Sequence, residues 1–318
     1  MVKLIADSTC DLSQELLERY HIDTAPLSVV LDGVTYRDKV DLTPDALYQR
    51  LPGLKDNPST AMPSPQAFLT LMEEALAAGY DEILCICMSS GTSGSYQAAV
   101  IARELFLTEH PSLAEQVYVL DSRGMSHGSG YLLIKSARLL AQGFTFRELV
   151  DFNETWKLHV KHFLSVDDLD NLIRSGRLTN VSAMIGKLLN LKPIMSMRGG
   201  KGAIVAKERG RKMVLNHYVR EFHSRMDPDL TDFLIIGYTS DRLYAESLRL
   251  RLVEEAGFTG EIFILQMGAA VGTHVGLGGL SLFFIEKDRS HDGLFVNEMK
   301  HLALQKDRLL ERIRSLQG

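Results

Sequence analysis

The sequence predicts an α/β protein of two domains, the first with a mainly parallel sheet flanked by helices and the second with a more antiparallel sheet. Three observations lead to this prediction. Apolar strand-like runs alternate with amphipathic helical patterns in the first half, as in parallel sheets covered on both faces. Near residue 158 the pattern changes, and a glycine-rich connection joins two strand-like segments as in an antiparallel hairpin. The length of 318 residues also suggests about two domains.

The first half reads as repeated strand, turn and helix units. A strand over 2–6 precedes a polar turn and a helix over 12–20, whose first turn can be capped by Ser or Asp side chains. The segments that follow are an extended stretch near 26–31, helices over 44–51 and 65–78, a strand over 83–88, a helix over 95–107, a strand over 117–120, and helices over 125–142 and 146–156. We expect the first domain to cover residues 1–157.

The second domain is expected over residues 158–286. Its predicted elements are a strand over 159–165, helices over 169–174 and 181–190, hairpin strands over 193–197 and 203–207, a helix over 212–226, a strand over 233–238, a helix over 244–255, and strands over 261–266 and 280–285. Residues 287–318 form a predicted helical extension, because apolar residues from Phe295 to Leu316 recur at spacings of three, four and seven. We favour docking of this helix on its own chain, with contact to a second copy or a partner as the alternative.

Composition excludes several classes of protein. With 45% hydrophobic and 24% charged residues and 25 Gly, the chain is neither disordered, collagen-like nor a disulfide scaffold. A net charge of −5 gives no general attraction to nucleic acid. Cys85 and Cys87 lie in an apolar strand and are expected in the core rather than at a metal. Because no signal peptide and no apolar stretch of ~18 residues is found, we expect a cytoplasmic protein.

Three loops of small polar residues carry the candidate chemistry. The loop Ser89-Ser-Gly-Thr-Ser-Gly-Ser95 follows a buried strand and opens a helix, so its amides and hydroxyls can bind an anion. A tight turn with capping serines would look the same. A second Ser/Thr cluster, 59–65, also precedes a helix, and a glycine-rich turn, 272–279, contains His274. We expect the three loops to converge on one site.

Other candidate residues are basic or imidazole side chains. His159 and His162 have no third ligand at a fixed spacing, so we expect surface histidines and no metal site. Arg177 and Arg209 lie beside turns, and residues 207–212 form a local basic patch that can dock an acidic partner or a phosphate. The chain lacks the glycine-rich fingerprints of dinucleotide and ATP sites.

The order and spacing of these motifs resemble the DegV family over about residues 1–286. The segments that carry the resemblance are Asp7–Leu12, 59–65, Ser89–Gln97, Ser175–Leu178, Lys192–Ile194 and Gly272–Gly276. Here Ala61-Met62 and Leu277 depart from the usual family pattern.

The resemblance implies one long-chain fatty acid bound between two domains by a chain with no catalysis and no cofactor of its own. Thr60, Ser93, the Gly94 backbone and His274 would hold the carboxylate. Arg177 and Arg209 would meet a separate fatty acid kinase subunit, which uses ATP and Mg to make acyl-phosphate for phospholipid synthesis. Transient membrane contact would allow lipid exchange.

Two questions stay open at this point: which residues contact the acyl tail, and whether the chain binds a lipid or hydrolyses one. Four apolar residues share one face of the helix predicted over 181–190, where core packing and lining of the acyl tail are equally good interpretations; they are Met184, Ile185, Leu188 and Leu189. The alternative function is a hydrolase of lipid or acyl substrates that uses Ser93 and His274 as nucleophile and base.

Overall fold

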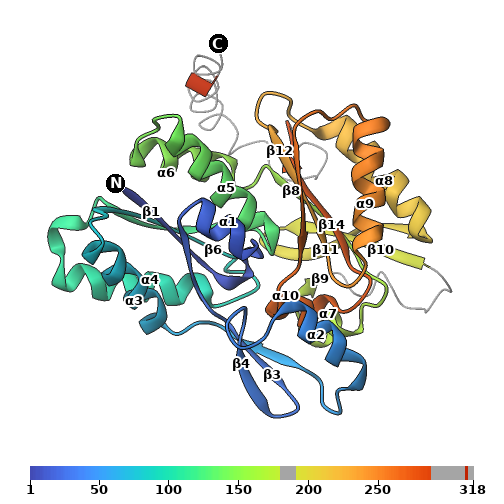
Figure 1. The fold of residues 1–318 in the computed structure, drawn as a ribbon, viewed down its shortest axis with the longest axis horizontal. Coiled ribbons are helices and arrows are strands. Elements are labelled where there is room, and N and C mark those ends of the chain that lie inside the picture. The colour runs from blue at the N-terminus through green and yellow to red at the C-terminus, as the bar shows by residue number, and fades with distance from the viewer. Residues whose placement is uncertain (180–190, 288–311, 314–318) are drawn as a thin grey trace.

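A computed structural model describes residues 1–179, 191–287 and 312–313 of the chain (Figure 1). Its first sheet is wholly parallel, as predicted, with strand order β2-β1-β6-β7. The strands are β1 (Val2–Asp7), β2 (Ile22–Ala25), β6 (Glu82–Cys87) and β7 (Val117–Asp121). β1 and β6 are buried at every position but the first, because helices cover both faces. Cys85 and Cys87 are fully buried, which confirms their place in the core.

The helices of this half lie within two residues of the predicted ranges. They are α1 (Gln14–Arg19), α2 (Pro44–Arg50), α3 (Pro65–Ala77), α4 (Ser95–Glu109), α5 (His127–Ala141) and α6 (Phe146–Trp156). Ser13, Thr43 and Ser64 each accept a hydrogen bond from the third helical amide, which satisfies one of the orphan donors of the first turn. Thr145 and Glu148 form a reciprocal capping box at α6.

A small antiparallel sheet lies beside α2, at the bottom of Figure 1. Its order is β4-β3-β5, with β3 (Ser28–Leu31), β4 (Val34–Arg37) and β5 (Ser59–Ala61). Only β3 corresponds to a predicted segment. β4 and β5 are short and partly exposed, so they lack the apolar alternation that predicts a strand, and pairing with β3 decides their conformation.

The second half forms a seven-stranded mixed sheet in the order β13-β12-β14-β8-β10-β11-β9, in agreement with the predicted antiparallel character. Its strands are β8 (Val160–Ser165), β9 (Leu178–Thr179), β10 (Leu191–Arg198), β11 (Lys201–Arg209), β12 (Phe233–Tyr238), β13 (Glu261–Gln266) and β14 (Leu280–Ile285). Its helices are α7 (Asp170–Arg174), α8 (Arg211–Arg225), α9 (Arg242–Glu254) and α10 (Ala269–Val275). β9 and α10 were not predicted.

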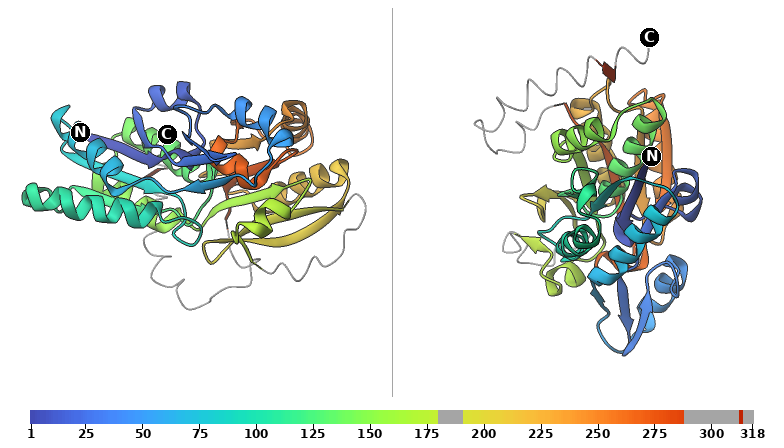
Figure 2. Two further views of the ribbon diagram at one scale, coloured as in Figure 1. Left: turned by 90° about the horizontal axis from the view of Figure 1, so that it is seen from below. Right: turned by 90° about the vertical axis from the view of Figure 1, so that its left-hand side faces the viewer.

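Helix α5 joins the two large sheets (Figures 1 and 2). Its first ten residues are all buried, and Tyr131 belongs to one apolar cluster with Leu4 of the parallel sheet and with Phe233 and Ile285 of the mixed sheet. The two halves therefore share a core, while the predicted domain boundary stays a prediction.

No helix among the described residues combines the length and apolar content needed to cross a membrane.

Two predicted segments fall outside the described residues. One is the helix over 181–190, and the other is the C-terminal extension except for Arg312 and Ile313. Ile313 is buried in the core cluster that contains α5, and Arg312 Nε lies 2.9 Å from Glu148 Oε1 of α6. These two residues dock on their own chain, which is the interpretation that the sequence favoured.

Candidate functional site

One cavity of about 490 Å³ lies where the three sheets meet. Thr9, Met88 and Ser126 line it from the loops that follow β1, β6 and β7, so it opens at the carboxyl edge of the parallel sheet, where α/β proteins usually bind ligands. The mixed sheet and α10 supply most of the remaining wall, which is largely apolar. Its volume lies within the range of roughly 300–1,000 Å³ that is usual for small-molecule sites.

Thr60 and His274 meet at one end of this cavity. Thr60 Oγ1 lies 2.8 Å from His274 Nε2, although 214 positions separate them in sequence. Burial, and to a lesser extent the charge of Arg177, lower the pKa of His274 to about 4. The imidazole is therefore neutral at pH 7 and keeps one N–H donor.

Ser93 and Gly94 line the same cavity from the start of α4. The Ser93 hydroxyl lies 2.9 Å from that of Ser95 and accepts from the Ser95 amide at 3.2 Å. The amide of Gly94 donates to no acceptor within the described residues. The exposed side chain of Met62 packs against Gly94, and its flexible end would have to move if Gly94 carried a Cβ. The predicted carboxylate-binding residues thus line one cavity.

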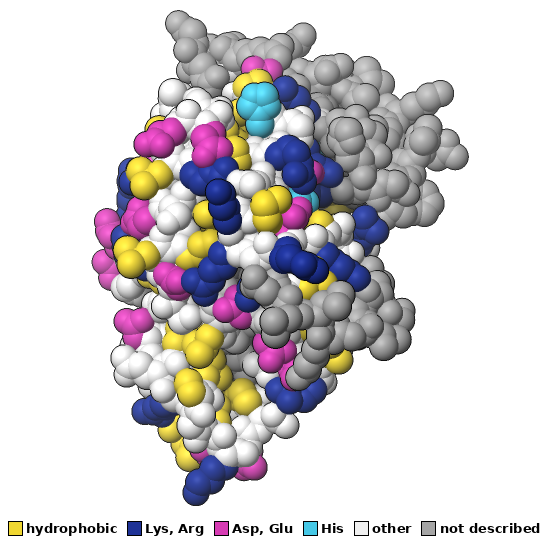
Figure 3. Space-filling view, turned by 90° about the vertical axis from the view of Figure 1, so that its right-hand side faces the viewer, with side chains coloured by type: hydrophobic (Ala, Val, Ile, Leu, Met, Phe, Trp, Pro, Cys, Tyr) yellow, Lys and Arg dark blue, Asp and Glu magenta, His cyan; other side chains and the backbone are white. Residues whose placement is uncertain are grey.

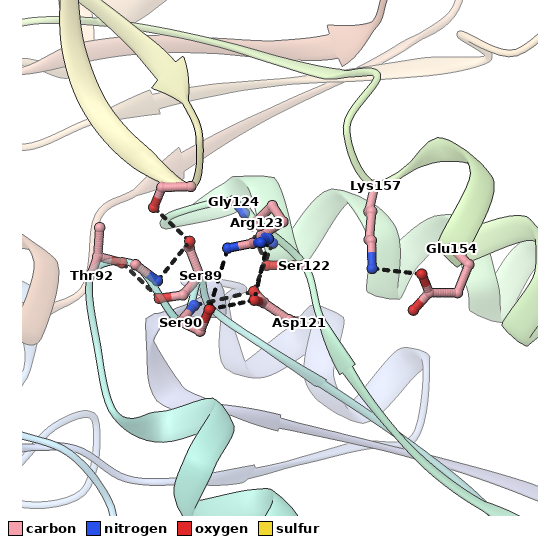
Figure 4. Close-up of polar contacts among 11 residues, drawn as sticks. Ser89, Ser90, Thr92, Asp121, Ser122, Arg123, Gly124, Glu154 and Lys157 are labelled. Carbon is pink, nitrogen blue, oxygen red and sulfur yellow. Dashed lines mark hydrogen bonds and ion pairs between the residues drawn. The ribbon is translucent and has the colours of Figure 1, made fainter. Parts of the chain in front are cut away.

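A polar cluster fixes the Ser89–Ser95 loop to its neighbours (Figure 4). The Ser90 hydroxyl donates to Asp121 Oδ2 at 2.5 Å, and Arg123 Nη1 reaches Ser90 Oγ at 3.4 Å. The Ser89 hydroxyl donates to the carbonyl of Gly200 at 2.6 Å, which ties the loop to the β10–β11 hairpin. These bonds hold the start of α4, and with it Ser93, against both halves of the molecule.

His274 lies in the last turn of α10, which corrects the expectation of a flexible glycine-rich turn. Gly272 allows α10 to pack closely on Tyr48, because a Cβ there would lie 2.7 Å from Tyr48 Cζ. Gly276 ends the helix with a φ of 75°, a conformation that favours glycine. Buried Asp11 accepts from the Gly268 amide at 2.9 Å. Burial raises the pKa of Asp11 to about 7. Gly272 hence marks close helix packing, whereas residues 276–279 form the turn that was predicted.

His162 also departs from its prediction, because it is buried rather than on the surface. It lies on the central strand β8 and lines the cavity, whereas His159 precedes the strand and is half-buried. Its Nδ1 lies 2.7 Å from the Val160 carbonyl, and burial lowers the pKa of the ring to about 4. Sequence spacing missed this residue, since only the pairing of β8 between β14 and β10 shows that the strand is central.

The two predicted partner-contact arginines lie far apart on the molecule. Arg177 lines the cavity next to Gly202, and its guanidinium donates to the Ser175 carbonyl at 2.7 Å. Arg209 is exposed at the other end of β11, seven residues or roughly 20 Å away along the strand. Figure 3 shows Lys and Arg side chains on the side of the molecule that carries α8 and α9. Arg211, from the predicted basic patch, is paired with Asp167 and Asp241.

The arrangement does not support the hydrolase alternative. Ser93 bonds with Ser95, and His274 with Thr60, so no hydrogen bond joins the supposed nucleophile to its base.

Among the residues the structure describes, no group of three or more His, Cys, Asp or Glu side chains could hold a metal ion.

The predicted acyl-tail residues cannot be placed. Met184, Ile185, Leu188 and Leu189 all lie outside the described residues. The cavity wall that the structure describes includes Leu164, Met195 and Val275 instead, together with His162 and with Ser126 and Ser281, two serines that the sequence did not single out. Ser126 follows a predicted strand at the same sheet edge as the serine loop, and that position was the available signal.

The sequence matches known proteins over most of its length. The sequence model of a family described as "Uncharacterised protein, DegV family" matches residues 1–287. A DegV domain-containing protein of Clostridium acetobutylicum is 34% identical over 294 residues, which cover 90% of this chain and 99% of the relative. One from Clostridium perfringens is 30% identical over 286 residues, again 90% of this chain and 99% of the relative.

Solved structures share the fold. A DegV family protein from Thermus thermophilus, described by its fatty acid binding, has a TM-score of 0.79 at 28% identity, and DegV from Bacillus subtilis, described as a fatty acid binding protein, has 0.76 at 28%. Each alignment covers 90% of this chain and 99% of the other. The fatty acid kinase B3 protein of Streptococcus pneumoniae, solved with linoleic acid, has a TM-score of 0.77 at 22% identity over 90% of this chain and 99% of that one, which shows the fold alone.

Proposed function

The chain belongs to the DegV family, and on this premise we propose that it binds one long-chain fatty acid in the cavity between its sheets and presents the carboxylate to a separate kinase. The observation that carries the proposal is the cavity itself, which is apolar along most of its wall and includes Thr60, Ser93, Gly94 and His274 among its polar lining residues. A long apolar chain with one anionic end has the matching chemistry.

Neutral donors would bind the carboxylate. Thr60, Ser93, Gly94 and His274 all line the cavity, and they offer the Gly94 amide, two hydroxyls and the His274 imidazole. A buried carboxylate must be hydrogen-bonded, and the N-terminus of α4 adds a favourable dipole. Because none of these four groups carries a full positive charge at pH 7, an oxygen of the carboxylate stays available to attack a phosphoryl group.

The apolar wall would supply most of the affinity. About sixteen methylenes at ~0.8 kcal/mol each give a gross transfer free energy near 13 kcal/mol. Association and ordering reduce this figure substantially, but the remainder is ample for tight binding. Leu164, Met195 and Val275 belong to one buried cluster and line the cavity, so they are candidate contacts for the tail. We keep Met184, Ile185, Leu188 and Leu189 as further candidates.

Lipid extraction from protein purified from a bacterial host tests the binding proposal. Mass spectrometry of the extract should show one long-chain fatty acid per chain, and native mass spectrometry should show the same ligand bound. Delipidated protein should then take up oleate or palmitate. Protein that carries no fatty acid and takes up neither would refute the proposal.

The kinase partner is proposed to contact Arg177 and Arg209. Arg177 lies at the cavity, beside the proposed carboxylate site, and Arg209 lies roughly 20 Å away along β11. A protein interface of ordinary size can cover both. The kinase would use ATP and Mg to convert the bound acid to acyl-phosphate for phospholipid synthesis. Transient contact with a membrane would allow exchange of the lipid.

Acyl-phosphate formation with a fatty acid kinase subunit tests this part. Arg209→Ala should slow the reaction while the bound lipid stays in place. Arg147→Ala is the matched control, because Arg147 is an exposed arginine whose ion pair, among the described residues, is with Asp151 of the same helix α6. Loss of lipid from Arg209→Ala, or equal rates for both variants, would show that Arg209 does not contact the kinase.

A further inference from the structure

Ser281 is a polar residue on an apolar row of the mixed sheet. Strand register places Gly237, Ser281, Leu164 and Met195 side by side across β12, β14, β8 and β10. Leu164, Met195 and Ser281 line the cavity, and in the next row so do Phe283 and His162. Ser281 therefore lines the cavity from deep within the mixed sheet, with its hydroxyl over Gly237 and beside the His127 ring.

The hydroxyl of Ser281 has no hydrogen-bond partner within the described residues. The side chain is fully buried and solvent does not reach its oxygen, so a ligand group contacts it only when neighbouring side chains of the cavity wall move aside. A buried hydroxyl without a partner is costly, and native proteins seldom keep one. A partner that enters through the cavity would satisfy it.

A second orphaned atom lies beside it, Nε2 of the buried His127. A Cβ on Gly237 would collide with both Ser281 Oγ and His127 Nδ1, so the two side chains fill the space above this glycine. Ser126 donates its hydroxyl proton to Asp11 at 2.5 Å and lies 3.3 Å from His127 Nδ1, so its oxygen accepts the Nδ1 proton. His127 Nε2 is then a lone-pair acceptor, and it is not bonded to Ser281.

We propose that Ser281 forms a second polar subsite in the cavity and selects an acyl chain that carries a hydroxyl group away from its carboxyl end. A hydroxyl both donates and accepts, so it complements the unpaired Ser281 hydroxyl, whereas a saturated tail leaves that hydroxyl without a partner. The inference rests on the proposed function, because it assumes that the carboxylate lies at Thr60 and His274. The ligand class is therefore hydroxy fatty acids.

Competition binding with delipidated full-length protein tests the subsite. Four acids compete in turn with a fluorescent fatty acid. They are stearate and three hydroxystearates, whose hydroxyl lies beside the carboxyl group, in mid-chain or at the methyl end. A mid-chain or terminal isomer should bind about tenfold more tightly than stearate, as one or two added hydrogen bonds predict. The isomer with the hydroxyl beside the carboxyl group should show no such advantage.

Ser281→Ala should reduce this preference to less than about twofold by removing the only group that the ligand hydroxyl is proposed to meet. Ser165→Ala is the matched control, because Ser165 is a buried serine on the neighbouring strand β8 that does not line the cavity. It should keep the preference.

Equal binding of stearate and every hydroxystearate by the wild type, as expected if Ser281 holds only a water molecule, would overturn the inference. An unchanged preference in Ser281→Ala would also overturn it. Failure of all the acids to bind would instead refute the proposed function, and the inference with it.

Discussion

Replacing Thr60 by Val tests how the carboxylate is held. The change removes the hydroxyl that lies 2.8 Å from His274 Nε2 and keeps a β-branched side chain on β5, where Thr60 pairs with Val29. The strand should therefore stay in place. What the protein loses is one donor to the ligand and one partner of the imidazole.

The structure sets the size of the effect. The pKa of His274 is lowered to about 4, so the imidazole is neutral at pH 7 and does not replace the lost donor with a charge. A hydrogen bond to a charged group contributes about 1.5–3 kcal/mol. The dissociation constant for stearate should thus rise by one to two orders of magnitude, since each ~1.4 kcal/mol is a factor of about ten.

Competition with a fluorescent fatty acid on delipidated protein at pH 7 measures this change. Thr60→Ser keeps the hydroxyl and should bind stearate within a small factor of the wild type. Methyl stearate carries no charge, so its affinity should change far less than that of stearate. Stearate binding by Thr60→Val within about twofold of the wild type, or an equal loss for the methyl ester, would refute the proposed carboxylate contact.

Three further predictions concern stability and the contacts around the site. Burial lowers the pKa of His162 from 6.5 to about 4, so between these values the unfolded chain binds the proton and acidification destabilises the fold. His162→Asn keeps a donor toward Val160 but does not titrate. Between pH 7 and pH 5 the unfolding free energy of the variant, measured by urea titration, should therefore fall by about 2 kcal/mol less than that of the wild type. Equal falls in the two proteins would contradict this. Gly128→Ala should destabilise the protein by about 1–3 kcal/mol in the same titration, because the new Cβ would lie 2.8 Å from His162 Cδ2; an unchanged midpoint would show that the ring moves freely. Ser89→Ala removes the 2.6 Å bond to Gly200 and should speed amide hydrogen exchange in the β10–β11 hairpin, whereas unchanged exchange would mean that the bond does not hold the hairpin.

Much of the fold follows from local patterns. Buried β1 and β6 each carry a continuous apolar run, and helices α1 and α3 begin at the capping residues Ser13 and Ser64, so periodicity and turn chemistry predict them. Elements without such signals were missed. β5 is short and half-exposed, and α10 is rich in small residues that resemble a turn.

Some residues of the candidate site were likewise predictable from local sequence, and others were not. The serine loop with Ser93 and Gly94 was predictable, because a strand, a small-residue loop and a helix follow one another in sequence. Burial of His162 was not predictable, since it depends on β8 pairing with both β14 and β10. The basic patch was predicted from charge alone, but the pairing of Arg211 with Asp167 and Asp241 depends on neighbours from other segments.

By itself the sequence determined the α/β class, most helices and strands, and the serine loop before α4, because each depends on residues that are close along the chain. Only the tertiary structure decided that Thr60 and His274 lie 2.8 Å apart and that Ser281 lines the same cavity. The first contact needs β5 to pair with β3 and α10 to pack nearby, and the second needs the register of the mixed sheet. A shift of one residue in that register would turn Ser281 to the other face.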